Sequence, residues 1–116
     1  MHRRNRLSRS RDFDAVYRQG RSVSTRYLVL YRFEREGDED GDARLGIAIP
    51  KKIGSAVTRN RIKRRLREAW RALLPEIQAG TDYVVLVRAP LAEAEESRGA
   101  DWLQERLEEV LGKARA

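Results

Sequence analysis

A run of basic side chains between residues 59 and 71 is the part of this sequence best suited to chemistry. Arg59, Lys63, Arg67 and Arg71 recur every four residues, so a helix would place them along one side. Like charges at this spacing destabilise an isolated helix, and Glu68 is the only acid within the run. A polyanion would supply the opposite charge and release counterions on binding. We therefore interpret the run as an RNA-binding surface, with a merely solvated charged face as the alternative.

Three aromatic residues and two lysines form a second candidate group. Phe13, Tyr17 and Tyr31 could stack on unpaired bases, while Lys51 and Lys52 hold the phosphate backbone. From the spacing alone, ordinary core packing is favoured, because apolar residues at helical spacing usually face a core.

Residues that could hydrolyse a phosphodiester are sparse. Such hydrolysis usually needs water activated on a metal ion, and a protein would hold that ion with clustered carboxylates or histidines. The only histidine is His2, and the acidic residues 36–42 lack the spacing and final glutamate of a calcium loop. The absence of cysteine excludes a disulfide framework and a Cys-bearing zinc site. We expect no catalytic residue and no metal site on this chain.

Length and charge indicate one basic domain. The 116 residues fit a single domain over residues 1–116, and the net charge is +7. Residues 1–33 carry +7 and residues 43–75 carry +9, whereas residues 34–42 carry −5 and residues 76–116 carry −4. Arginine outnumbers lysine 21 to 4, which suits phosphate and base contacts, although a genome-wide composition bias would give the same ratio. No apolar run approaches the roughly 20 residues of a membrane span, so we expect a cytoplasmic protein without a membrane partner.

The hydrophobic pattern predicts the elements that position these residues. Helices are expected before Gly20, over residues 56–74 and after Asp101, and strands at residues 26–33, 45–49 and 83–87. We expect the first two strands to form an antiparallel hairpin and the third to be central and buried. The stretch after Pro90 is expected to be irregular. The result is an α+β two-layer sandwich with a mixed sheet of three to four strands and a βαβ crossover, right-handed by default.

The central helix is expected to have two different sides at about 100° per residue. The side that packs on the sheet is predicted to contain Ile62, Leu66, Ala69 and Leu73, bordered by Trp70. The opposite side is predicted to contain Asn60, Lys63, Arg64, Arg67 and Arg71.

The residues around this helix match a known signature. Residues 51–69, KKIGSAVTRNRIKRRLREA, resemble the signature of the protein component of bacterial ribonuclease P, in which Arg59, Asn60 and Arg61 form the "RNR" motif. Positions near the N-terminus also match, among them Phe13 and Gly20, and the resemblance extends over residues 5–87. Tyr17 stands where phenylalanine is common in the family, a change that keeps an aromatic ring.

The resemblance implies a ribonucleoprotein that removes the 5′ leader of precursor tRNA by endonucleolytic cleavage. Contact with the catalytic RNA carries over to Arg59, Asn60, Arg61, Lys63, Arg64, Arg67 and Arg71. Contact with the leader, in a cleft between the first helix and the sheet, carries over to Phe13, Tyr17, Tyr31, Lys51 and Lys52. The resemblance therefore favours base stacking for the aromatics. It also implies a catalytic centre with Mg²⁺ on the RNA, one protein per RNA and a left-handed crossover.

Two other functions fit parts of the pattern. A small ribosomal-type structural RNA-binding protein would share the charge profile without requiring the aromatic cleft. An autonomous metal nuclease would cleave without an RNA subunit.

Overall fold

The structure is a computed structural model that describes residues 5–115, and these residues form helices, strands and short 3-10 turns. In chain order they are α1 (Ser10–Gln19), β1 (Arg21–Ser24), β2 (Leu28–Glu34), β3 (Arg44–Ala48), the 3-10 turn η2 (Lys51–Ile53), α2 (Ala56–Leu73), the 3-10 turn η3 (Leu74–Glu76), β4 (Thr81–Val87), α3 (Ala89–Arg98) and α4 (Ala100–Arg115). The expected mixed α+β class is confirmed. Within residues 5–115, no helix is long and apolar enough to cross a membrane.

The sheet has four strands in the order β1-β2-β4-β3. Strand β4 pairs antiparallel with β2 and parallel with β3, so it separates the two strands that were expected to form a hairpin. The predicted hairpin pairing is therefore wrong, whereas the predicted central, buried third strand is confirmed. The physical reason is burial: every residue of β4 except Leu86 is buried, and a central strand is the one that helices on both faces of the sheet cover most completely.

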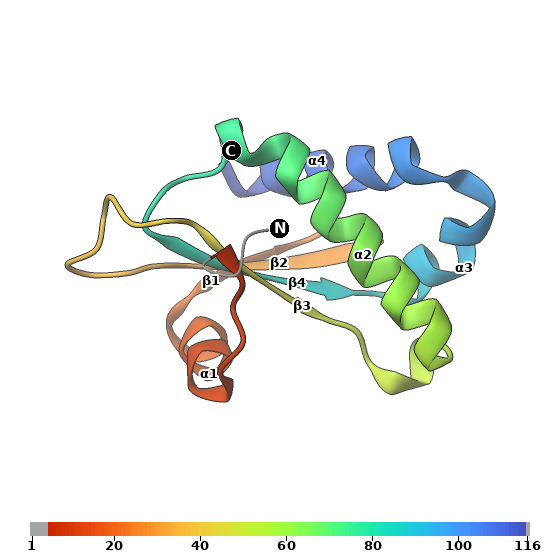
Figure 1. Cartoon of the computed structure of the whole chain (residues 1–116), viewed down its shortest axis with the longest axis horizontal. Helices are drawn as coiled ribbons and strands as arrows, with labels where there is room; N and C mark the ends of the chain where they lie inside the picture. The colour runs from red at the N-terminus through yellow and green to blue at the C-terminus, as the bar shows by residue number, and fades with distance from the viewer. Residues whose placement is uncertain (1–4, 116) are drawn as a thin grey trace.

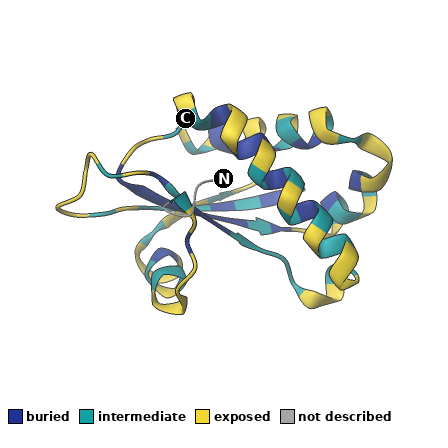
Figure 2. Ribbon diagram, viewed as in Figure 1, coloured by how far each residue is buried: buried dark blue, intermediate teal, exposed yellow. Residues whose placement is uncertain are grey.

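Helices cover both faces of the sheet (Figure 1). Helices α2 and α4 lie over one face, and α1 lies against the other. Figure 2 shows buried residues concentrated where α2 and α4 meet each other and the sheet. The side chains of β2 alternate between the two faces of the sheet: Leu28 and Leu30 join the core under α2 and α4, while Tyr31 and Phe33 face α1.

Local sequence explains where α2 begins and where α1 ends. Ser55 caps α2, since its hydroxyl oxygen accepts a hydrogen bond from the Thr58 backbone N–H at 3.2 Å. Gly20 ends α1 where the chain passes very close to the carbonyl oxygens of Val16 and Arg32, leaving no room for a Cβ atom. The apolar side of α2 is buried as predicted, at Ile62, Leu66, Ala69, Trp70 and Leu73.

Two elements differ from the sequence-based expectations. The stretch after Pro90 is not irregular: it forms α3, with the proline in its first turn, a position that favours helix initiation. Its apolar pattern is weak, because only Leu91 and Glu95 are buried. Strand β1 was not expected, since Val23 alone of its four residues is even partly buried. Helix α2 connects the parallel strands β3 and β4 as expected, and the left hand of this crossover remains a prediction.

Candidate nucleic-acid interface

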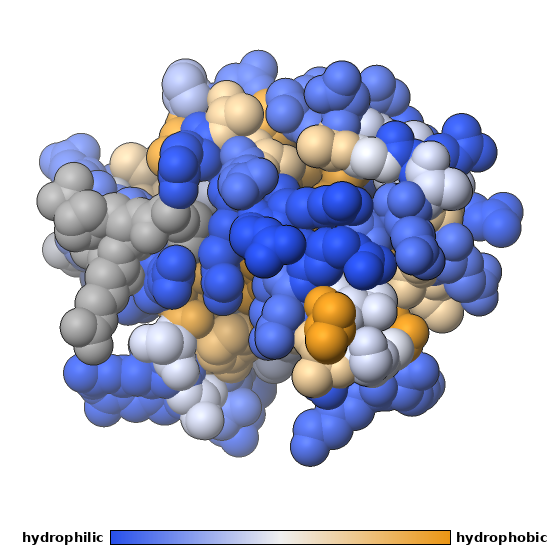
Figure 3. All heavy atoms as spheres, turned by 45° about the vertical axis from the view of Figure 1, so that its right-hand side comes forward, coloured by the Kyte–Doolittle hydropathy of each residue, from blue (hydrophilic) through white to orange (hydrophobic). Residues whose placement is uncertain are grey.

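The side of α2 that faces away from the sheet is cationic and unpaired. Asn60, Arg64 and Arg71 are exposed, and Lys63 and Arg67 are partly exposed. None of these four cations forms an ion pair with an acid in residues 5–115. Figure 3 shows a strongly hydrophilic area across the middle of one face of the molecule. The like charges along this side of α2 therefore repel one another, and a bound external anion would reduce this repulsion.

Three other arginines of α2 bind groups within the protein. Arg59 donates from Nε to the Gly54 carbonyl at 3.2 Å and steadies the loop that precedes the helix. Arg61 and Arg65 both bind the fully buried carboxylate of Glu95 on α3. The hydrogen bond to Glu95 raises the pKa of the Arg61 guanidinium, so this arginine stays charged. Arg61 was predicted to contact RNA, and this stays a prediction; in the structure its side chain binds the Glu95 carboxylate.

The N-terminal segment adds a residue to this surface that sequence reasoning did not assign. The Asn5 side chain donates to the Ala43 carbonyl at 3.1 Å, and Arg6 forms a parallel bridge with Leu45 of β3. Burial, together with repulsion from nearby Arg6, lowers the pKa of Arg67. The sequence signals for Arg6 were the strongly basic N-terminal block and the family resemblance that begins at residue 5, and neither could reveal which arginine lies beside α2.

The predicted aromatic residues come together on the opposite face of the sheet. Phe13 and Tyr17 of α1 have ring centroids 6.5 Å apart, and Tyr17 meets Tyr31 of β2 edge-to-face at 4.8 Å. We call these three residues the aromatic trio. Phe13 and Tyr31 are partly buried against a small core, whereas Tyr17 is 40% exposed. Burial, and secondarily the neighbouring Tyr31, raise the pKa of the Tyr17 hydroxyl.

The predicted lysines lie beyond the end of β3. Both Lys51 and Lys52 are exposed in η2, three and four residues after Ala48, which packs beside the aromatic trio. Lys52 also lines a hollow of about 560 Å³ together with Pro50 and Leu86. No direct contact joins these lysines to the trio.

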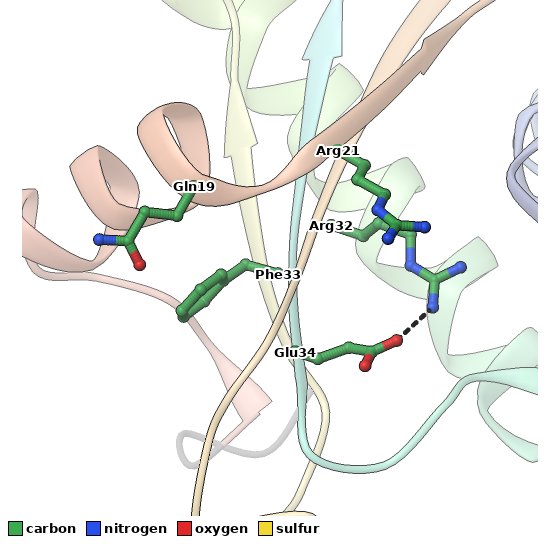
Figure 4. Close-up of a pocket in the computed structure, with 5 residues that line it drawn as sticks. All are labelled: Gln19, Arg21, Arg32, Phe33 and Glu34. Carbon is green, nitrogen blue, oxygen red and sulfur yellow. Dashed lines mark hydrogen bonds and ion pairs between the residues drawn. The ribbon is translucent and has the colours of Figure 1, made fainter.

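A separate hollow of about 260 Å³ lies where α1 passes into β1 (Figure 4). Figure 4 shows Arg21 and Arg32 extending to the same side, and Arg32 meets Glu34 at 3.1 Å. Its lining residues are Gln19, Arg21, Arg32, Phe33 and Glu34. None of them was predicted as a site residue, and the carboxylate of Glu34 already compensates part of the local charge.

The buried carboxylates of the described chain are paired with arginine. Asp82 of β4 is 3% exposed, and it accepts hydrogen bonds from Arg35 at 2.5 Å and from Arg44 at 2.7 Å. Arg35 also binds Asp38 and the Asp42 carbonyl, which ties the acidic turn to the sheet. Within residues 5–115, no three His, Asp or Glu side chains are grouped as metal ligands. His2 lies outside the described residues.

These features define a class of protein: a small α+β domain that presents a one-sided, uncompensated cationic helix on one face and clustered aromatics on the other, as RNA-binding subunits do. Comparison with known proteins narrows the class. The family model described as Ribonuclease P matches residues 1–115. The chain is 41% identical over 93 residues to the ribonuclease P protein component of Bacillus cereus strain G9842, covering 80% of this chain and 79% of that protein.

Solved structures of ribonuclease P proteins are also similar to this chain. The ribonuclease P protein of Thermotoga maritima superposes with a TM-score of 0.84 at 34% identity, covering 95% of this chain and 97% of that one. The Staphylococcus aureus ribonuclease P protein gives a TM-score of 0.83 at 35% identity, covering 95% and 94%. The chain belongs to the ribonuclease P protein family. This family supplies the protein component of the bacterial tRNA-processing endoribonuclease, an RNA-containing enzyme.

Proposed function

We propose that this chain binds the catalytic RNA of ribonuclease P through α2 and the 5′ leader of precursor tRNA through the aromatic trio. In this assignment it assists the Mg²⁺-dependent endonucleolytic removal of the leader, with one protein bound to each RNA in the cytoplasm. The observation that carries the proposal is the unpaired cationic side of α2.

The cationic side of α2 suits a folded RNA. This side offers four positive charges that form no ion pair with an acid in residues 5–115, on Lys63, Arg64, Arg67 and Arg71. The exposed Asn60 lies among them. Each phosphate that they neutralise would release counterions, so the affinity for the RNA should fall steeply with salt.

The aromatic trio suits a single strand. Tyr17 is 40% exposed, and Phe13 and Tyr31 are only partly buried, so aromatic surface is available for a base to stack on. Lys51 and Lys52, exposed in η2 beyond the end of β3, would bind leader phosphates. Because α1 and α2 lie on opposite faces of the sheet, the protein can hold the RNA subunit and the leader at the same time (Figure 1).

The chemistry of cleavage is assigned to the RNA subunit. Asp82 and Glu95, the buried carboxylates of the described chain, are each held by two arginines and are therefore poorly placed to bind Mg²⁺. Mg²⁺ on the RNA would activate the attacking water. The side chains of this protein would reduce repulsion between the leader and the RNA and hold the leader in place.

The test is cleavage of precursor tRNA by a cognate ribonuclease P RNA at low Mg²⁺, with and without the full chain. We expect cleavage at the mature 5′ end to be restored only when the protein is added. If a folded preparation gives no restoration, the proposal fails. Association with ribosomes and no effect on precursor tRNA would indicate a ribosomal-type protein instead, and cleavage by the protein alone would indicate an autonomous nuclease.

A further inference from the structure

Glu95 of α3 is a buried carboxylate that occupies two arginines of the RNA-binding helix. Its side chain is 0% exposed. Arg61 donates from Nε to both carboxylate oxygens at 3.1 and 3.3 Å, and from Nη2 to Oε1 at 3.0 Å. Arg65 donates from Nη1 to Oε2 at 2.5 Å. We call this set of three residues the Glu95 clamp.

The clamp is a principal connection between α3 and α2. Apart from Glu95, the only buried side chain of α3 is Leu91, so the helix has little apolar surface with which to attach itself. A carboxylate withdrawn from water is tolerated only when it is paired and hydrogen-bonded, and here two guanidinium groups supply both. The ion pairs therefore fix the position of α3 beside α2.

The clamp also decides which arginines of α2 can reach RNA. A guanidinium binds a phosphate most strongly through two parallel N–H groups, and Arg61 presents its Nε and Nη2 groups to Glu95. On the helix, Arg61 lies about 60° and Arg65 about 100° from Arg64. Both clamp arginines thus border the unpaired cationic side without belonging to it.

We propose that Glu95 sets the edge of the RNA-binding surface on α2. Arg61 and Arg65 act as positioning residues that hold α3, and RNA phosphates are bound by the unpaired side. That side consists of Asn60, Lys63, Arg64, Arg67 and Arg71. The second arginine of the RNR motif is therefore not an RNA contact in this protein. This inference rests on the proposed function, because it takes the ribonuclease P RNA as the ligand of α2.

Two charge-neutral double variants test the proposal. Arg61→Gln/Glu95→Gln removes the clamp, and Arg64→Gln/Glu96→Gln makes the same chemical changes at Arg64 and the exposed Glu96. Binding of each full-length variant to a cognate ribonuclease P RNA transcript is measured at several salt concentrations. We expect the clamp variant to keep the wild-type slope of log K against log salt. The control should lose about one unit of slope and about fivefold in affinity at moderate salt.

Each outcome decides a different point. An equal loss of slope in the clamp variant would show that Arg61 contacts RNA and would overturn the proposal. If the Arg64 control keeps the wild-type slope and affinity, the proposed RNA-binding function of α2 is refuted. The proposed edge of the RNA-binding surface is then refuted as well. Circular dichroism at the binding temperature establishes that each variant is folded. If the clamp variant unfolds, Arg61→Met/Glu95→Met replaces the pair with apolar groups of similar volume and takes its place in the comparison.

Discussion

Replacing Gly46 with alanine should disturb the aromatic trio without touching α2. Gly46 lies in β3 directly beneath the ring of Phe13. A Cβ atom there would lie 2.5 Å from Phe13 Cζ, 2.7 Å from Phe13 Cε1 and 3.3 Å from the Leu7 Cβ. Ordinary carbon contacts are about 3.5–4.0 Å, so the ring must move by about 1 Å or more.

The expected cost has two parts. Overpacking of this kind destabilises a protein by about 1–3 kcal/mol. Displacement of Phe13 also removes part of a stacking surface, and stacking on an aromatic side chain is worth about 1–3 kcal/mol per base. We expect the holoenzyme containing Gly46→Ala to bind precursor tRNA about tenfold more weakly, equivalent to about 1.4 kcal/mol, with mature tRNA affinity unchanged.

Equilibrium binding of both tRNAs and thermal unfolding measure these effects. Gly112→Ala is the control, because a Cβ at this position in α4 meets nothing within 4 Å. It should leave both affinities unchanged and stabilise the protein slightly, since alanine favours a helix over glycine by about 1 kcal/mol. Adding Phe13→Leu to Gly46→Ala should recover stability but not leader affinity. A destabilised Gly46→Ala that still distinguishes precursor from mature tRNA as the wild type does would refute the leader assignment.

Five further substitutions have defined outcomes. Arg64→Ala and Arg67→Ala should each weaken binding to the RNA subunit and lower the slope of log K against log salt by about one unit. The preference for precursor over mature tRNA should be unchanged. Binding measured at several salt concentrations tests this, and a loss of that preference would contradict the assignment of two separate surfaces. Arg21→Glu should raise stability by about 0.2–1 kcal/mol in denaturant unfolding, because Arg21 lies opposite another arginine in the β1–β2 register. Asp82→Asn should cost about 3–5 kcal/mol in the same assay, since it leaves two partly buried arginines without their carboxylate. The pKa of the Tyr17 hydroxyl is raised above 10.0 in the folded protein, which therefore favours the neutral hydroxyl. This contribution to stability is complete below pH 10 and is lost at higher pH. Tyr17→Phe should therefore reduce the loss of stability measured between pH 9 and 11.

Local patterns were sufficient for most of the individual elements. The helical spacing of apolar residues predicted α2 and its buried side. The strand predicted at residues 26–33 is present as β2, with Leu28 and Leu30 on one face and Tyr31 on the other. Such patterns succeed because they depend on contacts within one element or on which side of it meets water.

The order of the strands in the sheet could not be predicted from such local patterns. Strands β2 and β3 are joined by a short acidic turn, which favours a hairpin, but β4 inserts between them. Whether β2 pairs with β3 or with β4 depends on how much apolar surface each arrangement buries, and β4 is the most completely buried strand. Helix α3 was missed for a related reason: it has no apolar stripe, and its connection to α2 depends on the two ion pairs of Glu95 with Arg61 and Arg65.

By itself, the sequence determined the family, the basic helix, the aromatic residues and the cationic character of the binding surface. These are properties of residue types and short spacings, which the chain carries before it folds. Only the tertiary structure decided which basic residues are available. It placed Arg6 beside Arg67, and it brought Glu95, 34 residues along the chain, to Arg61. A charge is available to RNA only if no closer carboxylate neutralises it, and that depends on which distant segments the fold brings together.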